Sequence, residues 1–149
     1  MNEPAAGDAV DALFAAGTEP HVLAVIWATV DTERALAGIG LEAIQLPDDP
    51  LLGATVRLVR PSDGEPIALL EPRTEGRLSE WLARTGEGPA GRYVVAPDGL
   101  AEVSTRAAAA GIVLSRIAYG PFGPSVLVGR AAAGPQVVLV DRPAGTIEP

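Results

Sequence analysis

The sequence contains no cysteine and a single histidine among its 149 residues. The lack of cysteine excludes disulfides, thiolate nucleophiles and cysteine-ligated zinc. One histidine, His21, gives no convincing Ser-His-Asp order. Because His21 begins an apolar run, we interpret it as an exposed residue at a strand end; an unrecognised metal site around it is the alternative.

Basic residues and long apolar runs are also scarce. Lys and Arg number 11 against 19 Asp and Glu, a formal net charge of -8 at pH 7, and this sign repels phosphate backbones and anionic membranes. No apolar run approaches the ~20 residues that cross a bilayer. The acidic N-terminus lacks the basic region and the apolar core of a signal peptide. We therefore expect a cytoplasmic protein that binds neither nucleic acid nor membranes.

The sequence is rich in apolar residues, at 48%, and these fall into an order that is typical of β-α-β-β-β. A helix that Asp31 caps, and that Gly38 and Gly40 end, follows the first apolar run. The predicted strands of this first half span residues 21–30, 41–46, 54–60 and 66–71. A connecting helix follows, with Leu78, Trp81 and Leu82 on one face.

The second half repeats this order. A helix over 98–111 follows its first apolar run. The predicted strands span residues 92–97, 112–119, 125–130 and 135–142. The glycine-rich stretch at 85–97 precedes a strand and not a helix, so we interpret it as the joint between two repeats and not as a phosphate-binding loop.

Four motifs, "VDTERALA", "IALLEP", "LSEWLARTGEG" and "AAAAGI", follow one another in an order that resembles the vicinal oxygen chelate superfamily, in its glyoxalase and methylmalonyl-CoA epimerase-like branch. The resemblance covers about residues 22–141. It implies an α+β fold in which two tandem βαβββ modules form a curved mixed sheet or half-barrel. The implied divisions are an N-terminal extension (1–20), a first module (21–73), a helix and joint (74–90), a second module (91–142) and a C-terminal tail (143–149).

The same resemblance implies where a divalent metal would be held by His, Gln or Glu side chains inside each half-barrel. The four ligand positions fall on Ala24, on Ala68, on Gly91 or Arg92, and at or near Val138. None of these residues is a usual metal ligand. We therefore expect a protein without a metal or other cofactor.

The resemblance also implies which strand residues line the cavity. The predicted ligand-binding residues are Arg92, Ala24, Ile26, Ala68, Leu70, Val94, Gln136 and Val138. A partly buried Arg92 needs an acceptor, which is either a ligand oxygen or a carboxylate such as Glu71 or Glu87. Tyr93 is then expected to face the opposite way, and the loop at 119–125 either closes over the cavity or forms a rigid turn.

These expectations leave more than one function open. The first is the binding of a small, mostly apolar carbonyl- or carboxyl-containing metabolite in the barrel cavity. The alternative is a cofactor-free isomerase or cyclase, or a methylmalonyl-CoA epimerase-like enzyme, acting on a carbonyl compound or acyl thioester. Arg92 would then stabilise an enolate and Glu71 would act as the base. A third interpretation is a degenerate structural or regulatory domain that acts through a homodimer. Whether the chain is an enzyme therefore stays open.

Overall fold

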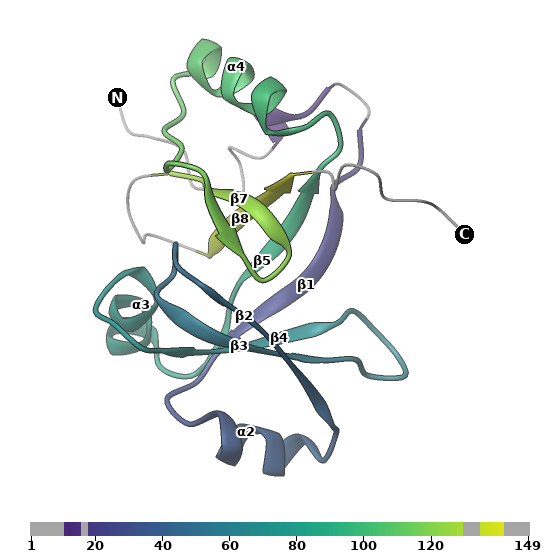
Figure 1. The fold of residues 1–149 in the computed structure, drawn as a ribbon, viewed down its shortest axis with the longest axis vertical. Coiled ribbons are helices and arrows are strands. Elements are labelled where there is room, and N and C mark those ends of the chain that lie inside the picture. Colours follow the sequence, from purple (N-terminus) through teal and green to yellow (C-terminus); the bar gives the residue numbers. More distant parts are fainter. Residues whose placement is uncertain (1–10, 16–17, 130–134, 142–149) are drawn as a thin grey trace.

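The computed structural model describes residues 11–15, 18–129 and 135–141. Within them, eight strands form one sheet in the order β2-β3-β4-β1-β5-β8-β7-β6 (Figure 1). β1 pairs in parallel with β4 and antiparallel with β5, so the two modules join through their first strands. The strands are β1 (His21–Ala28), β2 (Ala43–Asp49), β3 (Ala54–Val59), β4 (Ile67–Pro72), β5 (Gly88–Ala96), β6 (Ala118–Gly120), β7 (Gly123–Leu127) and β8 (Gln136–Asp141).

Capping residues mark the ends of the helices. In α2 (Thr32–Ile39) the Asp31 side chain accepts a hydrogen bond from the backbone N–H of Arg34, as an N-cap does, and Gly40 ends the helix at a φ of 73°. α3 (Arg77–Thr85) connects the modules, and α4 (Leu100–Ala110) ends at Gly111. No helix within the described ranges is long and apolar enough to cross a membrane.

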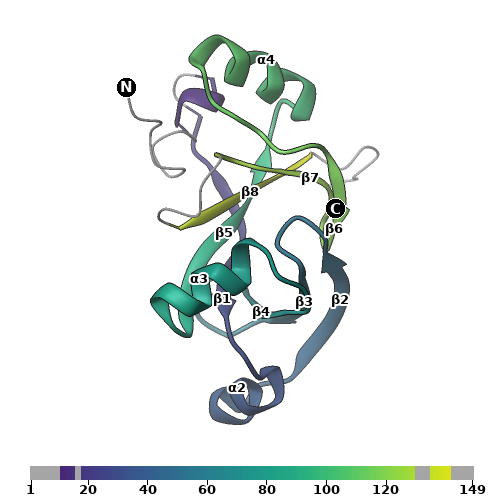
Figure 2. The ribbon, with the colours of Figure 1, turned by 90° about the vertical axis from the view of Figure 1, so that its left-hand side faces the viewer.

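The sheet curls until its two end strands, β2 and β6, contact each other, which gives a nearly closed half-barrel (Figure 2). α3 lies across its inner face, and α2 and α4 lie at opposite ends of the molecule. The interior cluster comprises Ala24, Ile26, Ala28, Leu52, Ala54, Val56, Leu58, Ala68, Leu70, Leu78, Trp81, Ala90, Tyr93, Leu127, Val138 and Val140. Strand residues alternate between faces, so a second cluster forms on the outer face.

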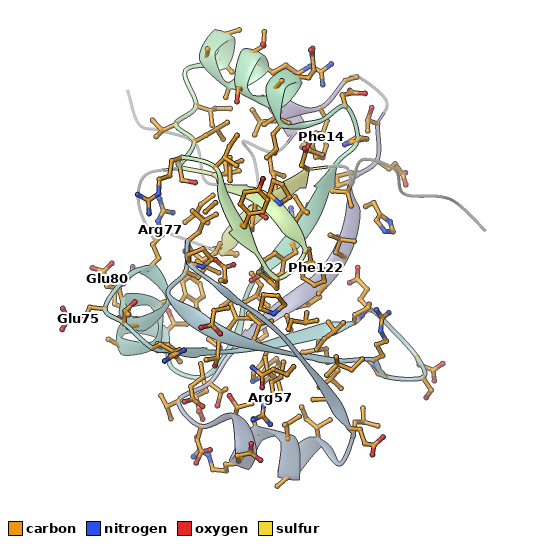
Figure 3. The ribbon with its side chains drawn as sticks, in the orientation of Figure 1. Phe14, Arg57, Glu75, Arg77, Glu80 and Phe122 are labelled. Atoms are coloured by element: carbon orange, nitrogen blue, oxygen red, sulfur yellow. The ribbon has the colours of Figure 1, made fainter. Side chains whose placement is uncertain are left out.

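The second cluster lies under α4, and we call it the α4 cluster. It comprises Leu13, Phe14, Val94, Ala96, Leu100, Val103, Ala107, Ile112, Val126, Val128, Val137 and Leu139. Leu13 and Phe14 precede β1 in the chain and pack beside the second module (Figure 3). Arg106 on α4 donates to the Leu13 carbonyl at 3.3 Å. Residues 1–10 and 16–17 of the predicted extension, and the predicted tail, 143–149, lie outside the described residues.

In the second module, one predicted strand is largely absent, and the structure decides between the two alternatives for the loop at 119–125. The predicted strand at 112–119 is largely wrong: only its end belongs to β6, with one isolated bridge from Leu114 to Val128. The reason is that the Ser115 hydroxyl accepts the Leu127 N–H, which interrupts the strand ladder. The loop at 119–125 is a tight turn between β6 and β7, and Phe122 packs edge-on against Tyr93 with ring centroids 4.9 Å apart.

Candidate functional site

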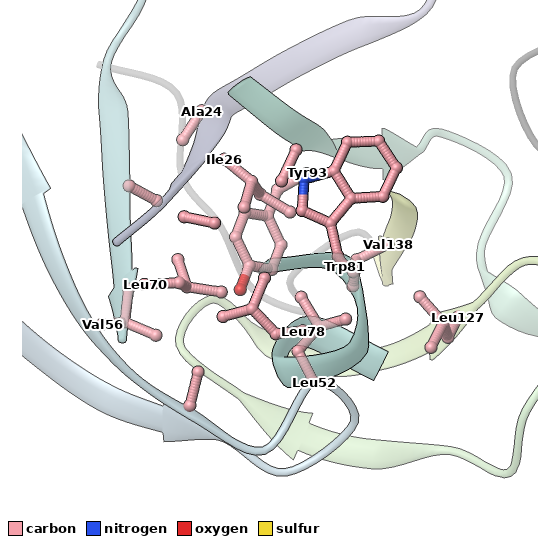
Figure 4. Close-up of a cluster of buried hydrophobic side chains, with 14 of the residues drawn as sticks. Ala24, Ile26, Leu52, Val56, Leu70, Leu78, Trp81, Tyr93, Leu127 and Val138 are labelled. Carbon is pink, nitrogen blue, oxygen red and sulfur yellow. The ribbon is translucent and has the colours of Figure 1, made fainter. Parts of the chain in front are cut away.

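The positions assigned to metal ligands lie deep in the half-barrel. Ala24, Ala68 and Val138 are all 0% exposed and belong to the interior cluster (Figure 4). The fourth position is neither Gly91 nor Arg92, because Tyr93 is the residue that pairs with both Ala24 and Val138. Tyr93 therefore points into the half-barrel, and the prediction that it faces outward is wrong.

Two irregularities in the pairing of β1 with β5 explain this shift. One lies between Val22 and Ala24 and the other between Ile26 and Trp27. Each adds an unpaired residue, so simple alternation fails on either side of it. Gly91 could carry no side chain in any case, because a Cβ there would lie 1.9 Å from the backbone oxygen of Gln136.

A buried polar pair occupies the interior. The Tyr93 hydroxyl donates to Asp49 Oδ2 at 2.6 Å, and the backbone N–H groups of Leu51 and Leu52 donate to Asp49 Oδ1 at 2.8 and 3.0 Å. Burial raises the pKa of Asp49, although these hydrogen bonds oppose the shift. Burial, followed by the nearby Asp49, raises the pKa of Tyr93 well above its ordinary value. Through these hydrogen bonds, Asp49 connects the turn that follows β2 to Tyr93 in β5.

This interior does not fit a divalent metal. Three of the four assigned positions carry apolar side chains, and the fourth carries a phenol that is already bound to a carboxylate. In the part of the chain that the structure describes, no three His, Cys, Asp or Glu side chains lie close enough to hold a metal ion. A catalytic metal needs three or four convergent donors, and this site supplies fewer.

The predicted cavity residues are divided between the two faces. Ile26 and Leu70 are in the interior cluster as expected, and both are 0% exposed. Gln136 is buried, and its side-chain oxygen accepts from Arg77 Nη1 at 3.4 Å. Val94, by contrast, lies in the α4 cluster, so its predicted placement is wrong. The irregular pairing described above is again the cause.

Arg92 and Glu71 are not brought together. Arg92 lies opposite Val25 and Val137 on the outer face, and its Nε is buried without a hydrogen-bond partner among the described residues. Glu71 Oε1 accepts from the backbone N–H and the hydroxyl of Thr32, and so ties α2 to β4. Val25 pairs with Ile67, four residues before Glu71, which separates the two by about 13 Å along the strand direction.

The outer face carries a cleft of about 320 Å³ between α2 and the strands β1 and β4. Its floor includes Trp27, which is 38% exposed, and α2 forms one wall. Most of the surface is apolar, with three polar side chains at the edge. The lining residues are Trp27, Thr29, Arg34, Ala35, Gly38, Ile39, Ile67 and Glu87.

The polar edge of the cleft centres on Glu87, in the joint between the modules. Glu87 Oε2 accepts from Val30 N and Thr29 Oγ1, both at 2.8 Å, and from Arg34 Nη2 at 2.6 Å. The hydrogen bond from Val30, and then that from Thr29, lower the pKa of Glu87. The sequence suggested Glu87 only as a partner for Arg92. In the sequence, only the position of Glu87 directly after Gly86, the glycine that ends α3, indicates that this side chain stabilises the joint.

The arrangement of the strands and helices identifies the fold. The nearly closed half-barrel of two βαβββ modules is the α+β fold of the vicinal oxygen chelate superfamily, as the sequence predicted. Among solved structures, methylmalonyl-CoA epimerases share it, which confirms the predicted branch at the level of fold. No protein-family model matches the chain, and no curated protein matches its sequence.

Three solved structures illustrate the similarity. A Streptomyces coelicolor methylmalonyl-CoA epimerase variant in complex with 2-nitronate-propionyl-CoA has a TM-score of 0.69 at 18% identity, over 89% of this chain and 100% of that one. The epimerase from Mycobacterium tuberculosis has a TM-score of 0.68 at 20% identity, over 88% and 93%. A hypothetical protein from Bacillus halodurans C-125 has a TM-score of 0.68 at 16% identity, over 89% and 100%.

Proposed function

We propose that this chain is a metal-independent binding protein for a small, mostly apolar molecule that carries a carbonyl or carboxyl group. The cleft beneath α2 is the observation that carries the proposal. Its volume of about 320 Å³ lies near the lower end of the roughly 300–1,000 Å³ that is usual for ligand pockets. The half-barrel interior, where the sequence predicted the ligand to bind, is filled by side chains.

The cleft has the composition of a small-molecule site. Trp27 offers a flat, partly exposed ring, and Ile39 and Ile67 offer branched aliphatic surface. Arg34 stands at the polar edge with one of its nitrogens bound to Glu87. A guanidinium has five N–H donors, so Arg34 retains donors for a ligand oxygen. Apolar walls with a few polar groups are typical of such pockets.

The enzyme alternative has less support. Arg92, the predicted enolate-stabilising residue, and Glu71, the predicted base, lie on separated parts of the sheet. The titratable pair inside the half-barrel is closed to substrate, because Asp49 is 1% exposed and Tyr93 0%. Proton transfer requires a group within hydrogen-bond reach of the substrate. Binding is therefore the function that the arrangement favours; cytoplasmic location and a homodimer stay predictions.

A blocking substitution tests the proposal. A Cβ at Gly38 meets no atom within 4 Å, so Gly38→Leu places a side chain in the cleft without displacing others. Ala37→Leu is the matched control, because Ala37 is exposed on the same helix and lies outside the lining. Both variants are made in a Trp81→Phe background, which leaves Trp27 as the single tryptophan reporter.

The readout is Trp27 fluorescence during titration with a library of aliphatic and aromatic carboxylic acids, ketones and amino acids. We expect a saturable change for at least one compound, a loss of affinity of at least tenfold in Gly38→Leu, and no change in Ala37→Leu. Calorimetry on the wild-type chain checks the same compound. An equal response in both leucine variants, or no response to the whole library, contradicts the proposal.

A further inference from the structure

The polar edge of the cleft narrows the class of ligand. We infer that the cleft takes a hydrophobic α-amino acid, whose ammonium group contacts Glu87 and whose carboxylate contacts Arg34. This inference rests on the proposed function, because it names the ligand class of the same cleft. The inference depends on the hydrogen-bonding atoms of Glu87 and Arg34 that have no partner among the described residues.

Glu87 uses only one of its two oxygens. Oε2 accepts all three hydrogen bonds, from Thr29, Val30 and Arg34, and Oε1 has no hydrogen bond to any residue that the structure describes. A carboxylate has about four lone-pair sites, so Oε1 can still accept from a ligand. The side chain is 37% exposed and borders the cleft, which makes Oε1 reachable.

Arg34 likewise uses only one of its nitrogens. Nη2 donates to Glu87, whereas Nε and Nη1 have no partner within the described ranges. The side chain is 60% exposed. An N–H on Nε and two on Nη1 therefore remain, and each nitrogen can donate to an oxygen of a carboxylate. The two residues offer one free anionic acceptor and free cationic donors, held side by side by their own 2.6 Å contact.

A zwitterion fits this arrangement better than a ligand with a single charge. Its ammonium donates to Glu87 Oε1 and its carboxylate accepts from Arg34, so four charges of alternating sign close a ring. A carboxylate alone would lie beside the Glu87 carboxylate, and an amine alone would lie beside the Arg34 guanidinium. Like charges at such distances repel. The formal net charge of -8 also disfavours a simple anion, but it does not repel a neutral zwitterion.

The rest of the cleft fits an apolar side chain. Trp27, Ile39 and Ile67 supply the contact surface, and Gly38 leaves open space on the α2 wall. A leucine, isoleucine or phenylalanine side chain would lie between the Trp27 ring and this wall. An amino acid with a charged side chain would instead place that charge against apolar surface, which is costly.

A matched set of probes tests the inference on the wild-type chain by calorimetry. L-leucine carries both charged groups, 4-methylpentanoate lacks the ammonium group, and 3-methylbutylamine lacks the carboxylate. We expect L-leucine to bind at least tenfold more tightly than either analogue. L-phenylalanine, 3-phenylpropionate and 2-phenylethylamine form a second set with an aromatic side chain.

Variants that remove one charge test which residue contacts the ammonium group of the ligand and which contacts its carboxylate. Glu87→Gln is expected to weaken L-leucine at least tenfold while 4-methylpentanoate binds no more weakly than to the wild type. Arg34→Gln is expected to weaken L-leucine similarly without weakening 3-methylbutylamine. Glu33→Gln is the control, because Glu33 pairs with Arg57 outside this cleft and should leave all affinities unchanged. Circular dichroism confirms that each variant is folded.

The outcomes separate this inference from the proposed function. If 4-methylpentanoate binds as tightly as L-leucine, the amino-acid class is overturned and the cleft is still a binding site. The same holds if none of the six probes binds but another library compound does so and Gly38→Leu abolishes its binding. If no compound binds, both proposals fail.

Discussion

The interior of the half-barrel and the cleft on its outer face are built from the same strands and have opposite properties. In β4, Leu70 points inward and is 0% exposed, whereas Ile67 lines the cleft. In β1, Ile26 is buried in the interior cluster and Trp27, next in the chain, is 38% exposed. Each region also contains a carboxylate, Asp49 inside and Glu87 outside. Packed side chains close the inner face of the sheet, and the outer face has a cleft beneath α2.

The largest expected effect compares the two faces of β4. Leu70→Ala should lower the free energy of unfolding by about 2–5 kcal/mol, because the cavity that it leaves is enclosed. Ile67→Ala removes a side chain that already borders open space, and should cost about 1 kcal/mol. Urea denaturation of both variants measures the difference. Equal losses would mean that the cleft is packed in solution.

A second prediction compares how the stability contributed by Asp49 in the interior and by Glu87 at the cleft depends on pH. The pKa of Asp49 is raised above its ordinary value of 3.8, so its folded form holds the proton more tightly than the unfolded chain does. Stability from this group therefore falls as pH rises from 3.8 through its folded pKa. The pKa of Glu87 is lowered below 4.5, so its contribution is lost as pH falls from 4.5 through its folded pKa.

Urea denaturation of the wild type and of each variant at a series of pH values between about 3 and 8 measures both contributions. The difference between wild type and Asp49→Asn should decrease with rising pH, and the difference between wild type and Glu87→Gln should increase. Two differences that change in the same direction would contradict the contrast between a buried and a hydrogen-bonded, exposed carboxylate.

The smallest expected effect lies on the α2 wall. Gly38→Ala should raise the free energy of unfolding by about 0.5–1 kcal/mol, because glycine weakens a helix interior and a Cβ there meets no atom within 4 Å. Gly40→Ala should lower it, since Gly40 has a φ of 73° that alanine rarely adopts. Thermal melts of the pair decide the matter. A destabilised Gly38→Ala would mean that the α2 wall has less open space around residue 38 than the structure shows.

Much of the fold could be predicted because its signals are local. Asp31 and Gly40 mark the ends of α2 within the sequence itself, and apolar runs mark most strands. The inward residue of β5 could not be predicted, because the irregular pairing with β1 depends on both strands together. Asp49 was missed since Tyr93, its partner, lies 44 residues away in the chain. The cleft depends on how α2 rests on the sheet, which no local pattern specifies.

The packing of Leu13 and Phe14 against the second module has a consequence for the order of folding. The backbone of Leu13 receives a hydrogen bond from Arg106, 93 residues later in the chain. During synthesis this segment leaves the ribosome before the second module, and its docking surface is completed only after α4, β7 and β8 emerge. Closing so long a loop costs chain entropy before any contact stabilises it. We therefore expect this segment to dock last, after the sheet has formed, and to be the first part to detach on unfolding.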